Sequence, residues 1–513
     1  MRASLAMKLA TLLVAQALSR PDEPALVCGE SRVTFLELHS ASDRIATALK
    51  QAGVMIGDRV AICLPNCSEF VAIFLAIVKC GGVALPINMH LSAAEIGLIF
   101  DDAEPVAVFF GDKERPVVSG IVEGTAIRRF TVGVEHHEGE IALSKALDCK
   151  SIPMAVPATH DDCVISYTSG TTGRPKGAIV TQANYIVANG FLNAIHWGLS
   201  QEDRILVTTP LAHRTAFARV GNMIILGCTL FVMPRFDAEE AARIIEQERI
   251  SVISIVPTVG RMLLPLIEAN PQRFSSLRLL VATGEAFPVD VKRRISAAIP
   301  ALGIFSFFAM TEAGALTMLR PADQFEHGES VGRVTPGVEI RLVGNNQKDV
   351  PEGEAGEIWV RSGVPGQYLI FREYFRQPEA TRDAFEDGWF KTGDIGRFDR
   401  DHYLHIVDRK KDMVLSGGYN IYSKEVELAL IRHSSVADAA VIGVSDEVYG
   451  EAVAAFVQLE SGASTSADEL VKWCTSELAA YKKPRHVVFL DELPRTSTGK
   501  VTKDKLRKLF KSH

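Results

Sequence analysis

Short β-rich runs alternate with helical patterns over the first four hundred residues, and this alternation limits the folds that the chain can adopt. The β-rich runs lie at residues 59–64, 106–110, 230–233, 252–256 and 279–282. The helical patterns lie at residues 36–52, 68–79, 93–100 and 238–248. Strands joined through helices pair in parallel and are covered by those helices. The sequence therefore predicts an α/β fold with parallel sheets covered by helices.

The pattern changes in the last third of the chain. Between Gly332 and Phe398 glycines are frequent and helical periodicity is weak, which predicts a β-rich subdomain over residues 331–398. Five consecutive charged residues follow at 408–412, and alone they would be interpreted as a solvated turn. Residues 413–513 then have the size and α/β pattern of a small domain. We therefore expect a large N-terminal domain over residues 1–407 and a small C-terminal domain over 413–513.

One segment, residues 167–177, combines three glycines, four hydroxyl-bearing threonine and serine residues and Lys176, directly after the strand-like run 163–166. Glycine lets backbone N–H groups approach an anion, the hydroxyls add donors, and Lys176 adds a positive charge. It is not the common Walker A loop, because Pro175 precedes Lys176 and Gly177 follows it. The segment predicts a phosphate-binding loop, and a flexible turn is the alternative.

Composition excludes several other classes of protein. The net charge of −7 argues against a nucleic-acid partner. The eight cysteines are scattered without zinc-like spacing, which indicates reduced thiols in a cytoplasmic protein. No stretch reaches the roughly 18 apolar residues of a transmembrane segment, and the apolar opening predicts a helix that ends before Pro21 rather than a signal peptide.

The phosphate loop resembles the signature loop of the adenylate-forming superfamily, which includes acyl-CoA synthetases, aryl-CoA ligases, peptide-synthetase adenylation domains and firefly luciferase. Five further matching segments follow in the expected order, at residues 210–213, 283–286, 307–312, 391–394 with Arg409, and 494–500. Chance matches would not keep this order. The resemblance implies an acyl-CoA synthetase that uses ATP, Mg²⁺ and CoA and acts on a small-molecule carboxylic acid. It also implies a hinge over residues 408–412, with Lys411 as its pivot, and a mobile C-terminal domain.

The resemblance assigns nucleotide-binding roles to individual residues. The phosphate-binding residues would be Thr168, Ser169, Gly170, Thr171, Thr172, Gly173 and Lys176. Thr168 and Glu312 would hold Mg²⁺, since a hard cation prefers few carboxylates plus phosphate oxygens. The adenine-binding residues would be Gly284, Glu285, Ala286, Phe308, Ala309 and Thr311. Glu285 departs from the usual Gly-Gly or Gly-Ala, and Phe308 and Ala309 replace Tyr and Gly, so an aromatic face remains for stacking without a hydroxyl.

Other assigned roles concern the ribose, catalysis and CoA. The Asp394 carboxylate suits a ribose diol, and Arg409 would add a donor. Lys500 would stabilise the negative charge at the α-phosphate and on the departing pyrophosphate. Gly418 would let the pantetheine arm of CoA approach the backbone closely. The candidates for contact with the rest of CoA are Tyr449, Lys424 and Lys482.

The acid substrate is predicted from the segment that begins at His213, which would face the acyl pocket. No acidic residue follows before Asp237, so an amino-acid substrate is not expected. The candidate pocket residues are His213, Phe217, Met223, Val256, Phe307 and Leu316, whose mostly apolar character favours a medium- or long-chain fatty acid. Arg214, Arg219 and Arg261 could receive a second carboxylate, but we expect them to be solvated helix arginines.

Alternative functions within the superfamily stay open. An aryl-CoA or carnitine-type CoA ligase would share these motifs, as would an acyl-AMP ligase that loads a carrier protein. A luciferase-like oxygenase is a more remote alternative. A catalytically inactive nucleotide binder is disfavoured, because Glu312, Asp394 and Lys500 are all present. The sequence leaves a homo-oligomer open.

Overall fold

The computed structural model describes residues 8–134, 136–151, 161–168, 175–284, 286–417, 419–495 and 501–511. By its internal contacts the chain divides into two compact units. The first unit contains Met1–Glu339 and Arg361–Phe390, and the second contains Ile340–Val360 and Lys391–His513. The expected hinge at 408–412 lies within the residues of the second unit, and its role as a pivot stays a prediction.

The predicted helices and strands of the first unit begin at the expected residue or one residue from it. The strands are β3 (Arg59–Cys63), β5 (Ala107–Gly111), β11 (Thr229–Val232), β12 (Val252–Ile255) and β13 (Leu279–Ala282). The helices are α2 (Phe35–Gln51), α3 (Ser68–Cys80), α4 (Ala93–Ala103) and α10 (Ala238–Gln247). The opening helix, α1 (Leu9–Ser19), ends before Pro21 as expected. Mixed α/β architecture is thus confirmed.

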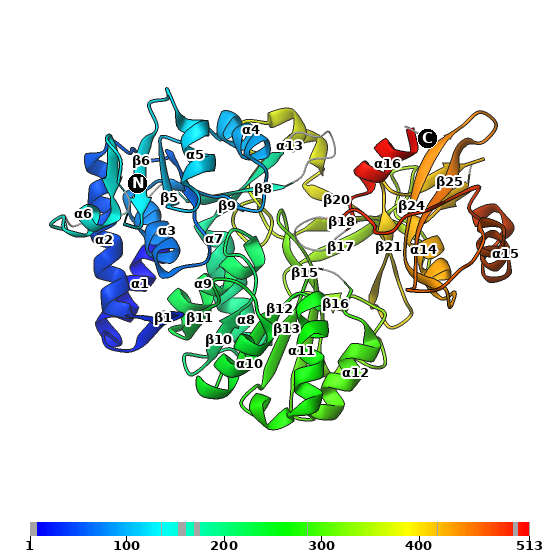
Figure 1. Ribbon diagram of the computed structural model, residues 1–513, viewed down its shortest axis with the longest axis horizontal. Helices are drawn as coiled ribbons and strands as arrows, with labels where there is room; N and C mark the ends of the chain where they lie inside the picture. The colour runs from blue at the N-terminus through cyan, green and yellow to red at the C-terminus, as the bar shows by residue number, and fades with distance from the viewer. Residues whose placement is uncertain are drawn as a thin grey trace. The chain divides into compact units, whose positions relative to one another are not determined.

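The first unit is built around two largely parallel sheets (Figure 1). Within the described residues, one sheet has the order β16-β15-β14-β13-β12-β10-β11-β1-β2, and the other has the order β7-β6-β5-β3-β4-β8-β9. The other strands of the first sheet are β1 (Pro24–Cys28), β2 (Ser31–Thr34), β10 (Arg204–Val207), β14 (Gly303–Met310), β15 (Gly314–Leu319) and β16 (Arg333–Val334). Those of the second are β4 (Val83–Pro86), β6 (Arg128–Val132), β7 (Glu140–Ala142), β8 (Asp162–Thr168) and β9 (Lys176–Thr181).

Helix α3 illustrates how the core of the first unit is filled. Every residue from 70 to 80 is buried, so this helix is covered on all sides. Its one buried charge, Lys79, donates to the Asp43 carboxylate at 2.6 Å and to the His39 carbonyl at 2.9 Å. Because a buried charge is tolerated when it is paired and hydrogen-bonded, this lysine fits an otherwise apolar helix.

The second unit has the predicted α/β composition. Its helices are α14 (Ser423–Ile431), α15 (Ala467–Glu477) and α16 (Lys503–Lys511). One of its sheets has the order β23-β22-β25-β24, with β26 (His486–Phe489) paired to β25. The strands of that order are β22 (Val414–Ser416), β23 (Tyr419–Ile421), β24 (Val436–Asp446) and β25 (Gly450–Leu459). Across the described residues, no helix is both long and apolar enough to cross a membrane.

The region predicted to be β-rich contains strands and one unpredicted helix. The strands include β17 (Glu339–Val343), β18 (Gly356–Arg361), β20 (Trp389–Phe398) and, just beyond the region, β21 (Leu404–Arg409). The helix is α13 (Pro378–Ala384), which has proline at its first position. Proline is favoured there because its fixed φ suits a helix start and its missing N–H is not needed.

Candidate active site

Four neighbouring parallel strands bring several predicted motifs to one sheet edge. The strands β10, β12, β13 and β14 are adjacent and parallel, so their carboxyl ends lie together. Those ends lead into the segment that contains His213, into Val256, into Gly284 and into Thr311–Glu312. Ligands bind at the carboxyl edge of parallel sheets, and this edge is therefore the candidate site of the first unit.

The predicted phosphate loop connects two antiparallel strands. In the β8–β9 hairpin Thr168 lies opposite Lys176, so the hydroxyl and the ammonium group flank the loop from its two ends. Residues 169–174, which include Ser169, Gly170, Thr171, Thr172 and Gly173, lie outside the described residues. Their contact with phosphate stays a prediction.

Glu312 accepts hydrogen bonds from two hydroxyl groups. The Thr168 hydroxyl donates to Glu312 Oε1 at 3.3 Å, and the Tyr374 phenol donates to the same oxygen at 3.1 Å. Lys176 Nζ lies 5.1 Å from the centre of the Tyr374 ring. Burial, followed by the Glu312 carboxylate, raises the pKa of Tyr374, so the phenol keeps the proton that it donates. Thr168, Lys176 and Glu312, far apart in sequence, thus lie in one cluster.

This cluster fits a magnesium ion that arrives with a nucleotide. It offers one carboxylate and hydroxyl oxygens, the hard donors that Mg²⁺ prefers when phosphate and water oxygens complete the shell. Across the described residues, no group of three or more histidine, cysteine and acidic side chains could hold a metal ion by itself. The donor set therefore suits a metal–nucleotide complex.

Tyr374 and Arg214 position Glu312, and neither was predicted to do so. Arg214 donates to the Thr311 carbonyl and, at 3.2 Å, to the Leu369 carbonyl. The Phe371 N–H donates to the Glu312 carbonyl at 2.7 Å. The expectation that Arg214 is a solvated helix arginine is wrong, because its guanidinium donates to two backbone carbonyl groups inside the protein. No motif in the sequence assigned Tyr374 a role beside Glu312.

Replacing Tyr374 by phenylalanine is expected to lower the rate of acyl-adenylate formation about tenfold, since Glu312 would lose a hydrogen bond to its charged form. The apparent affinity for Mg²⁺ should fall as well, because the carboxylate becomes less well oriented. Pyrophosphate release measured over a range of Mg²⁺ concentrations checks both effects. Tyr368→Phe is the matched control, as that phenol donates to the Pro336 carbonyl instead. An unchanged Mg²⁺ dependence in Tyr374→Phe would contradict the positioning role.

The predicted adenine-binding segments follow β13 and β14. Gly284 has a φ of +103°, a conformation that favours glycine and turns the chain at the end of β13. Phe308 is half-buried and Ala309 is exposed, and β14 changes register between them. Such bulges redirect side chains near active sites. Ala286 is exposed, whereas Glu285 lies outside the described residues.

The candidate acyl-pocket residues are packed in or against the core. His213 precedes α9 (Arg214–Leu226), and its Nε2 lies 3.4 Å from Asn88 Nδ2. Phe217 packs edge-on against Phe74 with a ring separation of 4.4 Å. Phe307 stacks on Trp197 at 4.7 Å. Met223 and Leu316 are fully buried, and Val256 is half-buried.

In the second unit, Asp394 and Arg409 are cross-strand partners. They lie opposite each other on β20 and β21, and Arg409 Nε contacts Asp394 Oδ1 at 2.9 Å. The Thr392 hydroxyl accepts from the Asp394 N–H at 3.1 Å and donates to the Ile358 carbonyl at 2.7 Å. Asp394 is buried, so its carboxylate is held in a fixed position suited to bidentate contacts.

The charged run 408–412 makes specific contacts within the second unit. Asp408 accepts from the Ser423 hydroxyl at 2.9 Å, and burial raises the pKa of Asp408. Lys410 pairs with Glu357 at 2.9 Å. Arg507 donates to Asp412 at 2.8 Å and to the carbonyl of Lys411 at 3.3 Å. These contacts hold Asp408, Lys410 and Asp412 within the second unit, whereas the Lys411 side chain is exposed.

The described residues expected to contact CoA lie on the second unit. Tyr449 lies beside Gly417, since an added Cβ at Gly417 would be 3.0 Å from the Tyr449 ring. Lys482 contacts both carboxylate oxygens of Glu425 at 2.6 and 2.7 Å, and Lys424 lies 3.9 Å from Glu427. Gly418 and Lys500 lie outside the described residues.

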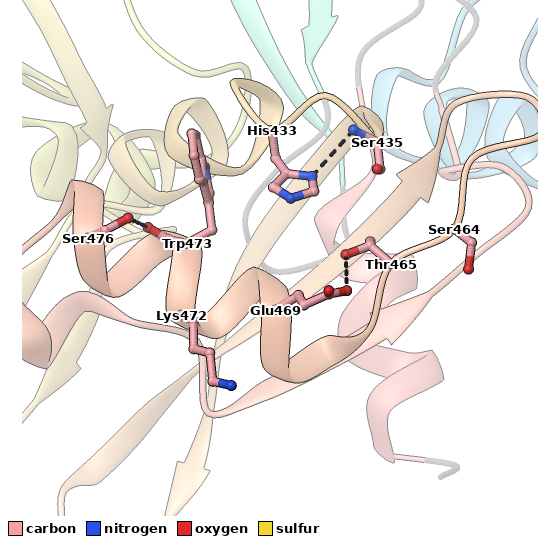
Figure 2. Close-up of a pocket in the computed structure, with 8 residues that line it drawn as sticks. All are labelled: His433, Ser435, Ser464, Thr465, Glu469, Lys472, Trp473 and Ser476. Atoms are coloured by element: carbon pink, nitrogen blue, oxygen red, sulfur yellow. Dashed lines mark hydrogen bonds between the residues drawn. The ribbon is translucent and has the colours of Figure 1, made fainter.

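A pocket of about 440 Å³ in the second unit does not include the predicted site residues. Its lining residues are His433, Ser435, Ser464, Thr465, Glu469, Lys472, Trp473 and Ser476. Figure 2 shows that the polar groups around it bond to one another: the Thr465 hydroxyl donates to Glu469 and the Ser435 N–H to His433. Thr465, Glu469 and His433 are thus engaged in local contacts.

Known proteins resemble this chain over almost its whole length. The family model described as AMP-binding enzyme matches residues 13–375, and that of the AMP-binding enzyme C-terminal domain matches residues 425–500. Long-chain-fatty-acid–CoA ligase FadD13 of Mycobacterium tuberculosis is 34% identical over 93% of each chain. Feruloyl-CoA synthase of an Amycolatopsis species is 34% identical over 97% of this chain and 98% of its own.

A solved structure agrees with these matches. ATP-bound MatB from Rhodopseudomonas palustris has a TM-score of 0.85 at 29% identity, covering 98% of this chain and 99% of its own. The matches extend across both units, as the order of the sequence motifs implied. The chain therefore belongs to the AMP-binding enzyme family, as an AMP-forming acid–CoA ligase that uses ATP and CoA.

Proposed function

We propose that this ligase activates a medium- or long-chain fatty acid as its acyl-adenylate and then transfers the acyl group to CoA. The cluster of Thr168, Glu312 and Tyr374 beside Lys176 carries the proposal. Hydroxyl, carboxylate and ammonium groups around one point suit a magnesium triphosphate. The apolar candidate pocket supports a fatty acid, as does the relative named a long-chain-fatty-acid–CoA ligase.

In the first half-reaction, a carboxylate oxygen of the acid attacks the α-phosphorus of ATP and the bond to pyrophosphate breaks. Thr168 and Glu312 would hold Mg²⁺, which offsets the charge of the phosphate oxygens when bound. Lys176 adds an ammonium group from the start of β9. Lys500 would stabilise the charge that develops at the α-phosphate and on the leaving pyrophosphate.

In the second half-reaction, the CoA thiolate attacks the acyl carbonyl and AMP leaves. Asp394 would hold the ribose diol, and Arg409 would donate to the same sugar or to the phosphate. Gly418 and Tyr449 would flank the pantetheine arm. Lys424 and Lys482 would contact CoA phosphates after exchanging their present glutamate partners. We also propose that residues 413–513 rotate about Lys411 between the two half-reactions.

An aryl-CoA ligase is the second candidate. Trp197 stacks on Phe307 and lies 6.2 Å from Phe305, ring centre to ring centre. Such a layer would suit a flat aromatic acid, and one relative is named a feruloyl-CoA synthase. We also propose a cytoplasmic location, because all eight cysteines are free thiols.

A pyrophosphate-release assay over a panel of carboxylic acids, with and without CoA, tests the proposed function. We expect release to require an acid, and a thioester to form only when CoA is present. Fatty acids should give higher kcat/KM than aryl acids. Turnover with an acyl-carrier protein but not with free CoA would contradict the assigned acceptor, and the absence of release with every acid would contradict the reaction itself.

A further inference from the structure

Arg219 is a buried cation without a hydrogen-bond partner for two of its nitrogen atoms. The residue lies on α9 with only 4% of its surface exposed. Its Nε and Nη1 atoms are inaccessible to solvent and bond no acceptor in the described part of the chain. Burial of an unpaired charge is costly. The expectation of a solvated arginine is therefore wrong here, and the arrangement needs another explanation.

The surroundings of Arg219 supply aromatic rings rather than an acid. Its guanidinium carbon lies 4.8 Å from the centre of the Trp197 ring, and that ring stacks on Phe307. Burial lowers the pKa of Arg219 to about 10. The side chain therefore stays protonated near neutral pH, and no carboxylate of the described residues bonds to its Nε or Nη1 atoms.

The neighbouring buried amide side chains, in contrast, have hydrogen-bond partners. Asn193 Nδ2 donates to Asn222 Oδ1 at 3.4 Å, and Asn222 donates in turn to the Asn189 carbonyl. These polar groups therefore satisfy one another inside the protein. Arg219, one helical turn before Asn222, makes no such contact through its Nε or Nη1 atoms in the described part of the chain.

Helix α9, which carries Arg219, and strand β14, which carries Phe307, both lead to residues assigned to acid activation. Arg219 follows His213 by six residues on α9, which places it about 9 Å further along the helix axis. Phe307, which stacks on the ring that covers Arg219, lies on β14, and this strand leads directly to Thr311 and Glu312. The unpaired cation thus lies on the same scaffold as the activation site, displaced from it along α9.

We propose that the acid activated by this enzyme carries a second anionic group, a carboxylate or a sulfonate, which pairs with Arg219. The reacting carboxylate would lie toward His213, and the apolar body of the acid would connect the two charged ends. Of the three arginines that were candidates for binding a second carboxylate, Arg214 already binds two carbonyls and Arg261 is exposed. This inference rests on the proposed ligase function and changes its substrate from a simple fatty acid to an apolar acid with an anionic group at each end.

The test compares α,ω-dicarboxylic acids and terminal sulfo acids with monocarboxylic acids of equal chain length, using acid-dependent ATP–pyrophosphate exchange. Wild-type protein should show a higher kcat/KM for a diacid than for its matched monoacid. Arg219→Met should reduce the ratio of kcat/KM for the diacid to kcat/KM for the monoacid about 30-fold, the typical effect of losing a charge-assisted hydrogen bond. Arg219→Lys should retain part of the preference, and Arg261→Met should retain all of it. A preference for dicarboxylic acids or for sulfo acids supports the inference and identifies the second anionic group.

The outcomes separate this inference from the ligase function. Exchange with monoacids only, or a diacid ratio unchanged in Arg219→Met, would overturn the inference and leave the ligase function intact. A purely structural role in supporting Trp197 predicts a lower melting temperature for Arg219→Met and an unchanged acid preference, which would also overturn it. Absence of exchange with every acid would instead refute the proposed function.

Discussion

Replacing Glu312 by glutamine is expected to slow carboxylate-dependent ATP–pyrophosphate exchange about a thousandfold. The glutamine oxygen could still accept hydrogen bonds from Thr168 and Tyr374, which now donate to Glu312 Oε1. The substitution therefore removes the negative charge while it keeps the hydroxyl contacts. A magnesium triphosphate would lose its one protein carboxylate in this cluster, and stabilisation of the charged transition state would fall accordingly.

Exposed Glu326 offers a matched control on the same unit, and Glu326→Gln should leave the exchange rate unchanged. Melting temperatures of both variants would show that the fold is kept, which matters because Glu312 is buried. If Glu312→Gln retained exchange within about threefold of the wild-type rate, about 0.6 kcal/mol of activation free energy, the proposed role of this carboxylate would be wrong.

Local sequence patterns were sufficient to locate several of the helices and strands. Short β-rich runs identified β12 and β13, and helical periodicity identified the starts of α3 and α10, because each of these signals lies within a few residues of the chain. The π-helix η1 (Ile186–Leu192) is different, because it has no such local signal in the sequence. Helices of this type occur at single turns and depend on packing against neighbouring elements.

Burial of the α9 arginines could not be predicted from the helix alone. A helical pattern shows which residues share a face, but it does not show which distant element covers that face. Arg214 is bonded to carbonyls of Thr311 and Leu369, and Arg219 is covered by Trp197. These partners come from segments up to 155 residues away in the sequence.

The role of Tyr374 was missed for the same reason. Its phenol reaches Glu312 across 62 residues of sequence, and one tyrosine in an aromatic run has no distinguishing spacing. Asp394 and Arg409 were predicted together only because both belong to recognised motifs. Their register on β20 and β21 gives the physical basis of that pairing, since directly opposed side chains on antiparallel strands are neighbours.

Replacing Lys500 by alanine is expected to abolish acid-dependent ATP–pyrophosphate exchange, with a loss of a thousandfold or more, while thioester formation from premade acyl-adenylate continues. Attack on the α-phosphorus places extra negative charge on its oxygens and on the departing pyrophosphate, and an ammonium group stabilises both. The second half-reaction releases AMP from an acyl carbon and involves no pyrophosphate. A lysine that acts only on the phosphates should therefore matter in the first step alone.

Lys505→Ala is the matched control for Lys500→Ala, since this lysine is exposed on α16 five residues further along the chain. It should leave both half-reactions at wild-type rates. The decisive measurement is the ratio of the two half-reaction rates in each variant, because a general loss of folded protein would lower both equally and leave the ratio unchanged. Parallel loss of both half-reactions in properly folded Lys500→Ala would contradict the assignment, whereas a loss confined to exchange would place this side chain at the phosphates.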